Sequence, residues 1–438
     1  MVCQVHADYR GDNILWKQDE SGSLTSAAAV DWQTLIWGPV IMDVSYFLGC
    51  SLTTVNRRAW QDDLIRTYYE ALGSEPGFTL GECKAAVKMH TFFGVLMAVI
   101  PPMLVQRTDR GDDLFMILID RHCNHVLDLD ALNVLPDAGA REPLRPLAAD
   151  DSTTHEPQPD KYWQESWYFD FVDLKQGIGG YVRLGSDPGA KRSWYTAVIC
   201  GPNRPTIAVV DFNAPLPDVK LSVETSKFSA SQECVSEMKE YKVRLHTSAA
   251  ESYGDPAKLL QGESGEAIAA ALDLTWTTAG EPYAYRLTTR YEIPCTVTGK
   301  LKIGDEVIEI NGVPGQRDHS WGARDWWAMD WVWSALHFDD GTRIHGLDLR
   351  IPSAPRMSCG YVQGLGAFDE VEKCEVEGVF ENGLPKTARF VIDGRELQFQ
   401  ALGHGPLRLV SDDGRVGQFP RAWGTVDGGV AWVEWMLN

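Results

Sequence analysis

The spacing of apolar residues changes once along the chain, and this change limits the possible folds more than any other feature of the sequence. Up to about residue 135, apolar side chains recur at the three- and four-residue intervals of a helix. After Tyr162 they alternate with polar residues in short runs, as in strands. The residues between, 136–160, are rich in Pro, Asp, Ala and Thr, which is typical of a linker. The pattern predicts an α+β protein with a helical part, 1–135, followed by a mainly antiparallel β body.

Three segments of the first part have helical spacing, at 60–72, 83–99 and 112–132. The most apolar run, 92–105, is interrupted by Pro101 and Pro102, which break a helix interior. It is also shorter than the roughly 20 residues that cross a bilayer. We therefore expect buried helices and no membrane span.

The β body shows strand candidates at 194–200, 206–212, 241–246, 272–277 and 306–310, separated by Gly, Pro, Asp or Asn. Around the last of these, Gly304-Asp305 and Asn311-Gly312 are two turn signals. Many short strands with few helices favour one large or two successive antiparallel barrels or sandwiches. From length, we place the first barrel at 161–270 and the second at 271–438.

Charge and cysteine usage exclude several functions and locations. The chain carries 61 acidic and 40 basic residues, a net charge of −21, which repels nucleic acid and anionic membrane surfaces. Its nine Cys are scattered singly, so neither a disulfide framework nor a Cys-based zinc site is indicated. With no signal-peptide pattern at residues 1–9, we expect a cytoplasmic protein. The oligomeric state does not follow from the sequence.

One cluster near the N-terminus has the layout that phosphoryl transfer requires. Asp8 is followed by Asn13, and Asp31 comes after an apolar strand candidate. In such sites the first Asp orients the acceptor hydroxyl, while the Asn and the later Asp hold Mg²⁺ on the nucleotide. Residues 2–130 thus resemble the C-lobe of the aminoglycoside phosphotransferase and choline kinase-like family. The resemblance implies Asp8 as the catalytic Asp and Asn13 and Asp31 as metal ligands.

This resemblance covers a part of that family's pattern. In the family an N-terminal lobe carries the phosphate-covering loop and the nucleotide-binding Lys, whereas here five residues precede His6. The phosphate clamp and one wall of the adenine cleft are therefore missing from the pattern. We expect an inactive helical remnant that packs as a platform, or a kinase that needs a missing lobe or partner.

The densest chemistry lies in residues 315–327, which hold two carboxylates, two guanidinium groups, an imidazole and three indoles. Buried charges must be paired, and exposed Trp is costly, so such a mixture fits neither a plain core nor a bare surface. It predicts a strand that lines a ligand pocket. The alternative is a structural Arg–Asp network that closes one end of a barrel.

Residues 160–438 resemble the hydroxyneurosporene synthase-like superfamily, carotenoid hydratases with tandem lipocalin-like β-barrels. The resemblance rests on the Asp-His-Ser-Trp-Gly run at 318–322 and on the strand at 343–349. It implies that His319, Trp321 and Asp348 line the site. The family's aromatic residue two positions before the Asp is Gly346 here, which affects substrate and direction of reaction.

Adding water to an unactivated alkene, or removing it from a tertiary alcohol, requires a proton donor, a base and aromatic faces that stabilise cationic character. We assign Asp348 as the acid, His319 as the base or water-positioning group, and Trp321 as one cation-facing wall. The other predicted site residues are Asp318 and Arg324, which orient this set, and Trp326, Trp327 and His345, which contact substrate. No metal or other cofactor is required.

Three functions remain open from the sequence. The first is a cofactor-independent hydratase, dehydratase or cyclase that acts on a small hydrophobic isoprenoid or steroid-like molecule. The second is a barrel that binds a hydrophobic ligand without catalysis, in which His319 and Asp348 have no catalytic role. The third is an ATP-dependent small-molecule phosphotransferase that uses Asn13 and Asp31.

Overall fold

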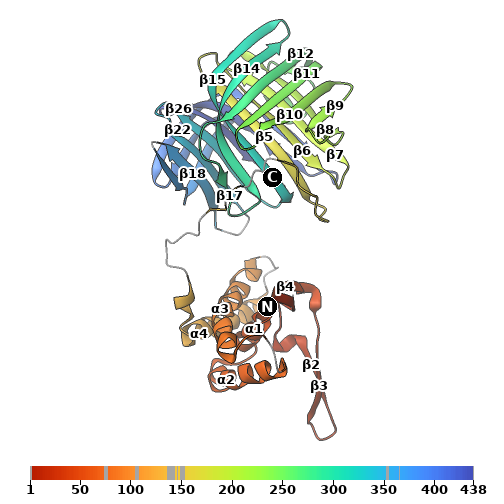
Figure 1. The fold of residues 1–438 in the computed structure, drawn as a ribbon, viewed down its shortest axis with the longest axis vertical. Helices are drawn as coiled ribbons and strands as arrows, with labels where there is room; N and C mark the ends of the chain where they lie inside the picture. Colours follow the sequence, from red (N-terminus) through yellow and green to blue (C-terminus); the bar gives the residue numbers. More distant parts are fainter. Residues whose placement is uncertain are drawn as a thin grey trace. The chain divides into compact units, whose positions relative to one another are not determined.

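The computed structural model describes residues 2–73, 77–103, 108–135, 144–145, 147, 153–351, 355–364 and 366–437. The chain divides into two compact units, Met1–Glu142 and Pro143–Asn438 (Figure 1). The division falls inside the predicted linker 136–160. Apart from residues 144, 145 and 147, the linker up to residue 152 lies outside the described residues.

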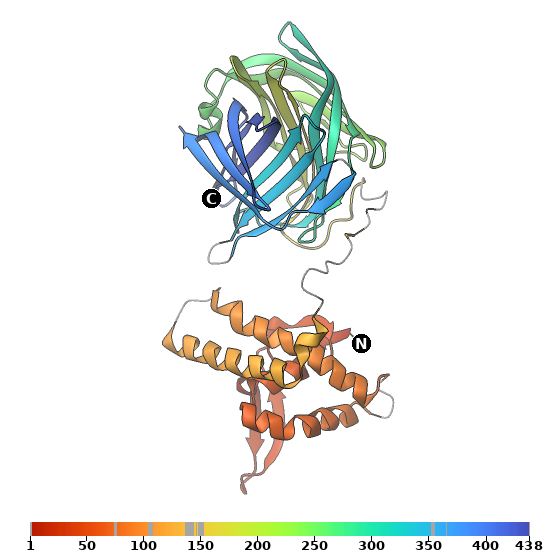
Figure 2. The ribbon, with the colours of Figure 1, turned by 90° about the vertical axis from the view of Figure 1, so that its left-hand side faces the viewer.

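The first unit combines two short antiparallel strand pairs with four α-helices (Figure 2). Its strands are β1 (Val2–Val5), paired with β4 (Ile36–Pro39), and β2 (Ile14–Gln18), paired with β3 (Leu24–Ala29). Its helices are α1 (Met42–Cys50), α2 (Thr54–Ala71), α3 (Leu80–Val99) and α4 (Asp109–Asp128), with 3₁₀ turns at Gly11–Asn13, Trp32–Thr34, Pro101–Met103 and Ala131–Val134. Among the described residues, no helix has the length and apolarity needed to cross a bilayer.

The three predicted helices are α2, α3 and α4, and each begins several residues earlier than its apolar pattern. The reason is N-capping, because Thr53, Thr79 and Thr108 each accept a backbone N–H of the first turn. The expectation that the whole first part is helical is wrong for its first 39 residues. Strands of four to six residues that are largely exposed leave no clear period in the sequence.

The described residues of the second unit form two large antiparallel sheets and one separate strand pair. The strands of the first are β5 (Trp163–Asp173), β6 (Ile178–Asp187), β7 (Arg192–Gly201), β8 (Arg204–Ala214), β9 (Ser222–Glu224), β10 (Phe228–Ser236), β11 (Glu240–Tyr253), β12 (Glu266–Thr278), β13 (Tyr283–Ala284), β14 (Arg290–Ile303) and β15 (Glu306–Ala323), with helix α5 (Ala257–Gln261) between β11 and β12. Eight of these strands form a closed ring in the order β12-β14-β15-β5-β6-β7-β8-β11, and β11 pairs back with β12. The first sheet is therefore a closed barrel.

The strands of the second sheet are β16 (Asp330–Phe338), β17 (Arg343–Arg350), β18 (Met357–Gly364), β19 (Ala367–Glu370), β20 (Cys374–Glu381), β21 (Leu384–Ile392), β22 (Arg395–His404), β25 (Arg421–Val426) and β26 (Gly429–Met436). Strands β23 (Leu407–Val410) and β24 (Val416–Phe419) form a separate pair. Side chains of β17 and β18 bond to the backbone of β20, which lies at the other end of the strand order. The sheet thus curves until its two ends meet.

The predicted boundary between the barrels, at residue 270, falls within strand β12. The first sheet continues to Ala323 because β14 pairs with β12 and β15 pairs with β5. Of the two turn signals, Gly304-Asp305 lies between β14 and β15, but Asn311-Gly312 lies inside β15. Gly312 has a φ of +67° at a register shift opposite Val297 and Thr298, so it forms a β-bulge and the strand continues.

Apolar residues pack in separate layers of the second unit. One cluster, which includes Phe169, Tyr241 and Trp276, fills the closed barrel. A second, which includes Trp333 and Tyr285, packs between the two sheets, and a third lies inside the curved second sheet. Strands β14 and β15 border both the barrel interior and the layer between the sheets, and the polar groups described next come largely from them.

Candidate functional site

Strand β15 sends consecutive side chains of the 316–321 segment to opposite sides of the barrel wall, because side chains alternate along a strand. His319 stacks on Trp167 inside the barrel, with ring centroids 4.8 Å apart. Gln316 instead reaches the second sheet, where its Oε1 accepts the hydroxyl of Tyr361 at 3.1 Å. Asp318 shares the Gln316 side and bonds to Arg290. The neighbours Asp318 and His319 therefore belong to two different polar clusters.

The cluster between the sheets is built around one guanidinium group. Arg290 Nη2 donates to Asp318 Oδ2 at 2.7 Å and lies 2.8 Å from Glu292 Oε1. The two carboxylates are buried, with 5% and 0% of their side chains exposed, whereas Arg290 is 22% exposed. Arg290 is thus the shared ion-pair partner of both buried carboxyl groups, and it lies at the solvent-exposed end of the cluster.

Glu292 accepts donors from both sheets. Trp333 Nε1 donates to Oε1 at 2.9 Å, and Gln316 Nε2 donates to Oε2 at 3.0 Å. The hydroxyl of Tyr285 lies 3.3 Å from Oε1. The donors from Trp333 and Gln316 hold this carboxylate in one orientation.

Tyr285 and His345 form a short hydrogen bond, with 2.6 Å between the hydroxyl oxygen and Nε2. His345 Nδ1 lies 2.9 Å from the carbonyl oxygen of Ser334, which can only accept. Nδ1 therefore carries the proton, and Nε2 accepts the proton of Tyr285. Burial, with Arg290 nearby, lowers the pKa of His345 to about 3, so the ring stays neutral and orients the Tyr285 hydroxyl.

The carboxyl group of Asp318 has a raised pKa. Burial raises its pKa to about 7, Arg290 opposes this rise, and the charge of Glu292 adds to it. Two further guanidinium groups act on Asp318 from nearby. Burial lowers the pKa of Arg324 to about 9 and that of Arg183 to about 10. Near neutral pH, Asp318 is thus a carboxyl group that can both give and take a proton.

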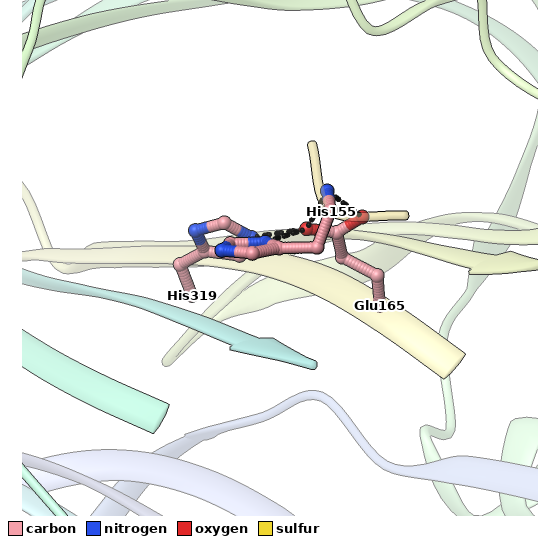
Figure 3. Close-up of side chains that lie close together, drawn as sticks. All are labelled: His155, Glu165 and His319. Atoms are coloured by element: carbon pink, nitrogen blue, oxygen red, sulfur yellow. Dashed lines mark hydrogen bonds and ion pairs between the residues drawn. The ribbon is translucent and has the colours of Figure 1, made fainter. Parts of the chain in front are cut away.

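A second polar cluster lies inside the closed barrel (Figure 3). Glu165 Oε1 lies 2.7 Å from His155 Nδ1 and 2.8 Å from His319 Nε2. The backbone N–H of His155 also reaches both oxygens of Glu165, at 3.2 and 3.1 Å. Burial raises the pKa of Glu165, but the hydrogen bonds from His155 and His319 outweigh it and leave this pKa below its ordinary value.

The structure does not bring Asp348 to His319, which is a correction to the predicted pocket. Asp348 lies in the second sheet, where its Oδ2 accepts the N–H of Val376 at 3.1 Å and Nη2 of Arg350 at 2.8 Å. His345, three residues earlier, faces the layer between the sheets. Asp348 and His345 therefore lie on opposite faces of β17, and Asp348 joins β17 to β20.

The predicted tryptophans occupy different surroundings. Trp321 stacks on His155, with ring centroids 3.9 Å apart, at the cluster inside the barrel. Trp326 donates to Gln164 Oε1 at 2.9 Å, and Trp327 packs with it against β23 and β24. The predicted orienting residue Arg324 donates to Ser320 Oγ at 2.7 Å.

Several members of these clusters are not among the residues predicted from the sequence: Tyr285, Arg290, Glu292, Glu165 and His155. The pair Arg290 and Glu292 had a signal, because two opposite charges at alternate positions at the start of β14 lie on one face of the strand and can pair. Glu165 is likewise the one acid among the inward residues of β5 near its start. His155 had no such signal, since it precedes the first strand of the barrel.

In the first unit, the predicted phosphotransferase residues form a defined loop. Asn13 Nδ2 donates to Asp8 Oδ2 at 3.0 Å and to its backbone oxygen at 2.9 Å. Asp43 accepts the backbone N–H groups of His6 and Ala7, at 2.7 and 2.9 Å. Asp31 is exposed, two residues after the end of β3. Its backbone has the left-handed conformation, with a φ of +67°. Asp8 and Asn13 are thus in contact.

Two surface cavities of about 610 and 770 Å³ lie elsewhere in the second unit. The first is lined by residues such as Arg244, Asp273 and Lys300, and the second by residues such as Tyr253 and Lys258. Neither contains a member of the two polar clusters, so neither is assigned to this chemistry.

The fold and the two clusters define a class: a double β-barrel protein of lipocalin-like architecture with ionisable groups buried in and between its sheets. The chain belongs to the DUF7064 family, described as a domain of unknown function, whose model matches residues 148–438. Residues 3–75 match the ecdysteroid kinase-like family, in agreement with the kinase-like resemblance predicted for the N-terminal part. A search of curated proteins finds no match.

The solved structures that match this chain include the following three, one of which is named as a hydratase. A protein from Nitrosomonas europaea assigned as AttH is 13% identical, with a TM-score of 0.46 over 69% of this chain and 99% of its own. Kievitone hydratase from Nectria haematococca is 13% identical, with a TM-score of 0.43 over 64% of this chain and 91% of its own. CghA, solved with Sch210972, is 12% identical, with a TM-score of 0.39 over 63% and 88%.

Proposed function

We propose that the second unit is a hydro-lyase, a hydratase or dehydratase, that acts by acid–base catalysis on a small hydrophobic alcohol or alkene of isoprenoid type. The observation that carries the proposal is Asp318, a buried carboxyl group whose pKa is raised to about 7. A general acid is most effective when its pKa lies near the working pH. This acid lies beside fixed cations and aromatic rings, between two sheets.

In the dehydration direction, protonated Asp318 gives its proton to the substrate hydroxyl, and the carbon–oxygen bond breaks to release water. The carbocation that develops then loses a proton from the adjacent carbon to the Asp318 carboxylate. One carbon–hydrogen bond breaks, the double bond forms, and Asp318 returns to its protonated state. Hydration is the reverse sequence, in which Asp318 first protonates the alkene.

The surrounding groups supply what such a reaction needs. Tyr285, Trp333 and Tyr168 form an aromatic wall, with centroids of the last two 5.3 Å apart, and aromatic faces stabilise cationic charge. Arg290 holds the Asp318 carboxylate after it has given up its proton. His345 fixes the Tyr285 hydroxyl, which can hold the released water by a hydrogen bond. The wall also favours an apolar substrate.

The experiment is a screen of terpene alcohols and alkenes with the full chain, followed by gas chromatography of the products. Wild type should turn over at least one member, and Asp318→Asn should lose the turnover, because the amide cannot donate a carboxyl proton. Asp348→Asn removes a comparably buried carboxyl group in the second sheet and should retain turnover. Wild type that only binds these compounds, seen as quenched Trp fluorescence without product, would favour the non-catalytic binding barrel.

A second candidate function belongs to the first unit alone. Contact between Asp8 and Asn13, with Asp43 holding the loop backbone, favours a phosphotransferase-type site for a hydroxyl acceptor. It predicts that the chain binds Mg²⁺–ATP and that Asn13→Ala and Asp31→Ala weaken the binding. Equal binding by wild type and both variants, measured by calorimetry, would contradict it.

A further inference from the structure

The cluster inside the closed barrel consists of three side chains of the kind that bind metal ions. His155 precedes β5, Glu165 lies on β5, and His319 lies on the paired strand β15 (Figure 3). Their ligand atoms all lie within 4.8 Å of one another. Within the described residues, no other group of three or more His, Cys, Asp or Glu is arranged in this way.

The three groups form an unusual hydrogen-bond arrangement. One oxygen atom, Glu165 Oε1, receives both imidazoles, at 2.7 Å from His155 and 2.8 Å from His319. Glu165 is 3% exposed and His319 is 0% exposed, whereas His155 is 24% exposed. Both histidine N–H groups point at one buried carboxylate. A single metal ion bound between the three groups could therefore replace the two N–H protons.

The rings are held before any ion binds. His155 stacks on Trp321 with an interplanar angle of 9°, and His319 stacks on Trp167 with an angle of 19°. The backbone N–H of His155 is also bound to the Glu165 carboxylate. Ligands fixed by packing lose little conformational entropy when a metal binds, which favours a specific site.

The geometry requires only small movements. In a tetrahedral zinc site with bonds of about 2.0–2.2 Å, neighbouring ligand atoms are about 3.3 Å apart. Each imidazole nitrogen would therefore move about 0.5 Å away from Glu165 Oε1. Rotation about side-chain bonds supplies shifts of this size.

We propose that the first barrel binds one divalent transition metal ion of the zinc type through His155 Nδ1, the Glu165 carboxylate and His319 Nε2. Two imidazoles and one carboxylate favour Zn²⁺, Co²⁺ or Fe²⁺ over Ca²⁺ and Mg²⁺, which prefer oxygen ligands. Three protein ligands leave a further coordination position for water or an oxygen ligand. The site lies on the opposite side of β15 from Asp318, so it is separate from the proposed hydro-lyase site.

On binding, each ring nitrogen that now faces Glu165 must lose its proton and coordinate through its lone pair. A neutral imidazole does this by moving the proton to its other nitrogen, and a protonated one releases it to solvent. The metal would also join the segment before β5 to the barrel wall. It should therefore raise the melting temperature of the second unit.

The test uses the full chain without a histidine tag, stripped with a chelator and titrated with Zn²⁺ in a calorimeter. Wild type should bind one equivalent, and His155→Ala and His319→Ala should each weaken binding by about 100-fold or more, since even outer partners of a ligand are worth 10–100-fold. His246→Ala removes an exposed histidine of β11 and should leave the affinity unchanged.

Two further measurements keep the result interpretable. His155 is partly exposed and outside the strands, so His155→Ala should fold like wild type in circular dichroism even if the buried His319→Ala does not. The visible spectrum of the Co²⁺ form should show nitrogen and oxygen ligation without a thiolate charge-transfer band, although the chain has nine free cysteines. No binding by wild type, or equal binding by His155→Ala, would overturn the proposal.

Discussion

Asp318 and Glu292 share the guanidinium group of Arg290 in the cluster between the sheets. Glu292 has additional donors in Trp333 and Gln316. Burial is the main cause that raises the pKa of Asp318; Arg290 opposes the rise, and the charge of Glu292 adds to it. A buried carboxyl group beside a second carboxylate therefore keeps its proton to a higher pH than an exposed one.

The pH dependence of catalysis follows from this acidity. Both directions of the proposed reaction begin with protonated Asp318, whose pKa is about 7. We expect kcat/KM to be level below that pH and to fall about tenfold per pH unit above it. A pH–rate profile of wild type measures this, and a profile that rises through pH 7 would contradict the assignment.

Stability should depend on pH through the same residue. The pKa of Asp318 is raised from 3.8 to about 7, so the folded chain keeps a proton that the unfolded chain loses in this range. This contribution to the free energy of unfolding is fully present below about pH 4 and is lost as the pH rises through 7. The Asp318→Asn variant has a side chain that cannot ionise at this position, so the variant does not lose this stability as the pH rises.

The melting temperature of Asp318→Asn minus that of wild type should therefore increase from pH 4 to pH 8, as measured by thermal denaturation. Asp369→Asn, at an exposed position, serves as the matched control and should show no such trend. A difference for Asp318→Asn that does not change with pH would show that the residue keeps its ordinary acidity in the folded state.

At the scale of the strand, β17 shows how the second sheet closes. Asp348 accepts the N–H of Val376 on β20, and Arg350 donates to the carbonyl oxygen of the same residue. Gly346, on the Asp348 face, has no room for a side chain, because a Cβ there would lie 2.7 Å from Cys374 Sγ. Gly346 thus permits the close approach of β20.

Asp348 is therefore expected to act on stability. Asp348→Ala leaves the N–H of Val376 without its acceptor and Arg350 without its carboxylate partner, so we expect the free energy of unfolding to fall by about 2–4 kcal/mol. Asp348→Asn keeps an acceptor oxygen and should lose less. Urea denaturation measures both, and equal stability of Asp348→Ala and wild type would contradict a closing role.

Strand β15 also shows what the sequence could and could not predict. The density of polar residues at 315–327 predicted a strand that lines a pocket. Strand β15 ends at Ala323 with residues 315–320 buried, and alternation explains why Asp318 and His319 separate. Asp318 finds its partner Arg290 on the preceding strand β14, whereas His319 finds Glu165 on β5, which is distant in sequence. Glu165 and His319 are 154 residues apart, and local pattern does not encode the pairing of β5 with β15 that brings them together. The bulge at Gly312 had the same local signal as a turn.

At the scale of the whole molecule, the two units have separate cores. Clusters around Leu48 and Tyr46 lie in residues 1–142, and the clusters of the β body contain none of these residues. The division into a helical part and a β body could be predicted because the spacing of apolar residues in each unit depends on that unit's own secondary structure. The boundary within the β body could not, since β14 and β15 complete the first sheet late in the sequence.

Independent cores predict independent activities. Asp8→Asn should leave hydro-lyase turnover within about twofold of wild type, because Asp8 bonds to Asn13 and Tyr46 within the first unit. The measurement is kcat/KM on the same terpene substrate for both proteins. A loss of tenfold or more would show that the first unit takes part in the reaction of the second.

The central claim is that Asp318 is the proton donor and acceptor of a hydro-lyase, and the most direct measurement compares kcat for wild type, Asp318→Asn and Asp348→Asn. On a substrate that wild type turns over, we predict that Asp318→Asn lowers kcat by about 10²–10⁴-fold, the usual worth of a general acid or base. Asp348→Asn should remain within about threefold of wild type at a temperature where it is folded. The assignment would be contradicted if Asp318→Asn kept full activity. It would also be contradicted if folded Asp348→Asn were the only variant to lose activity.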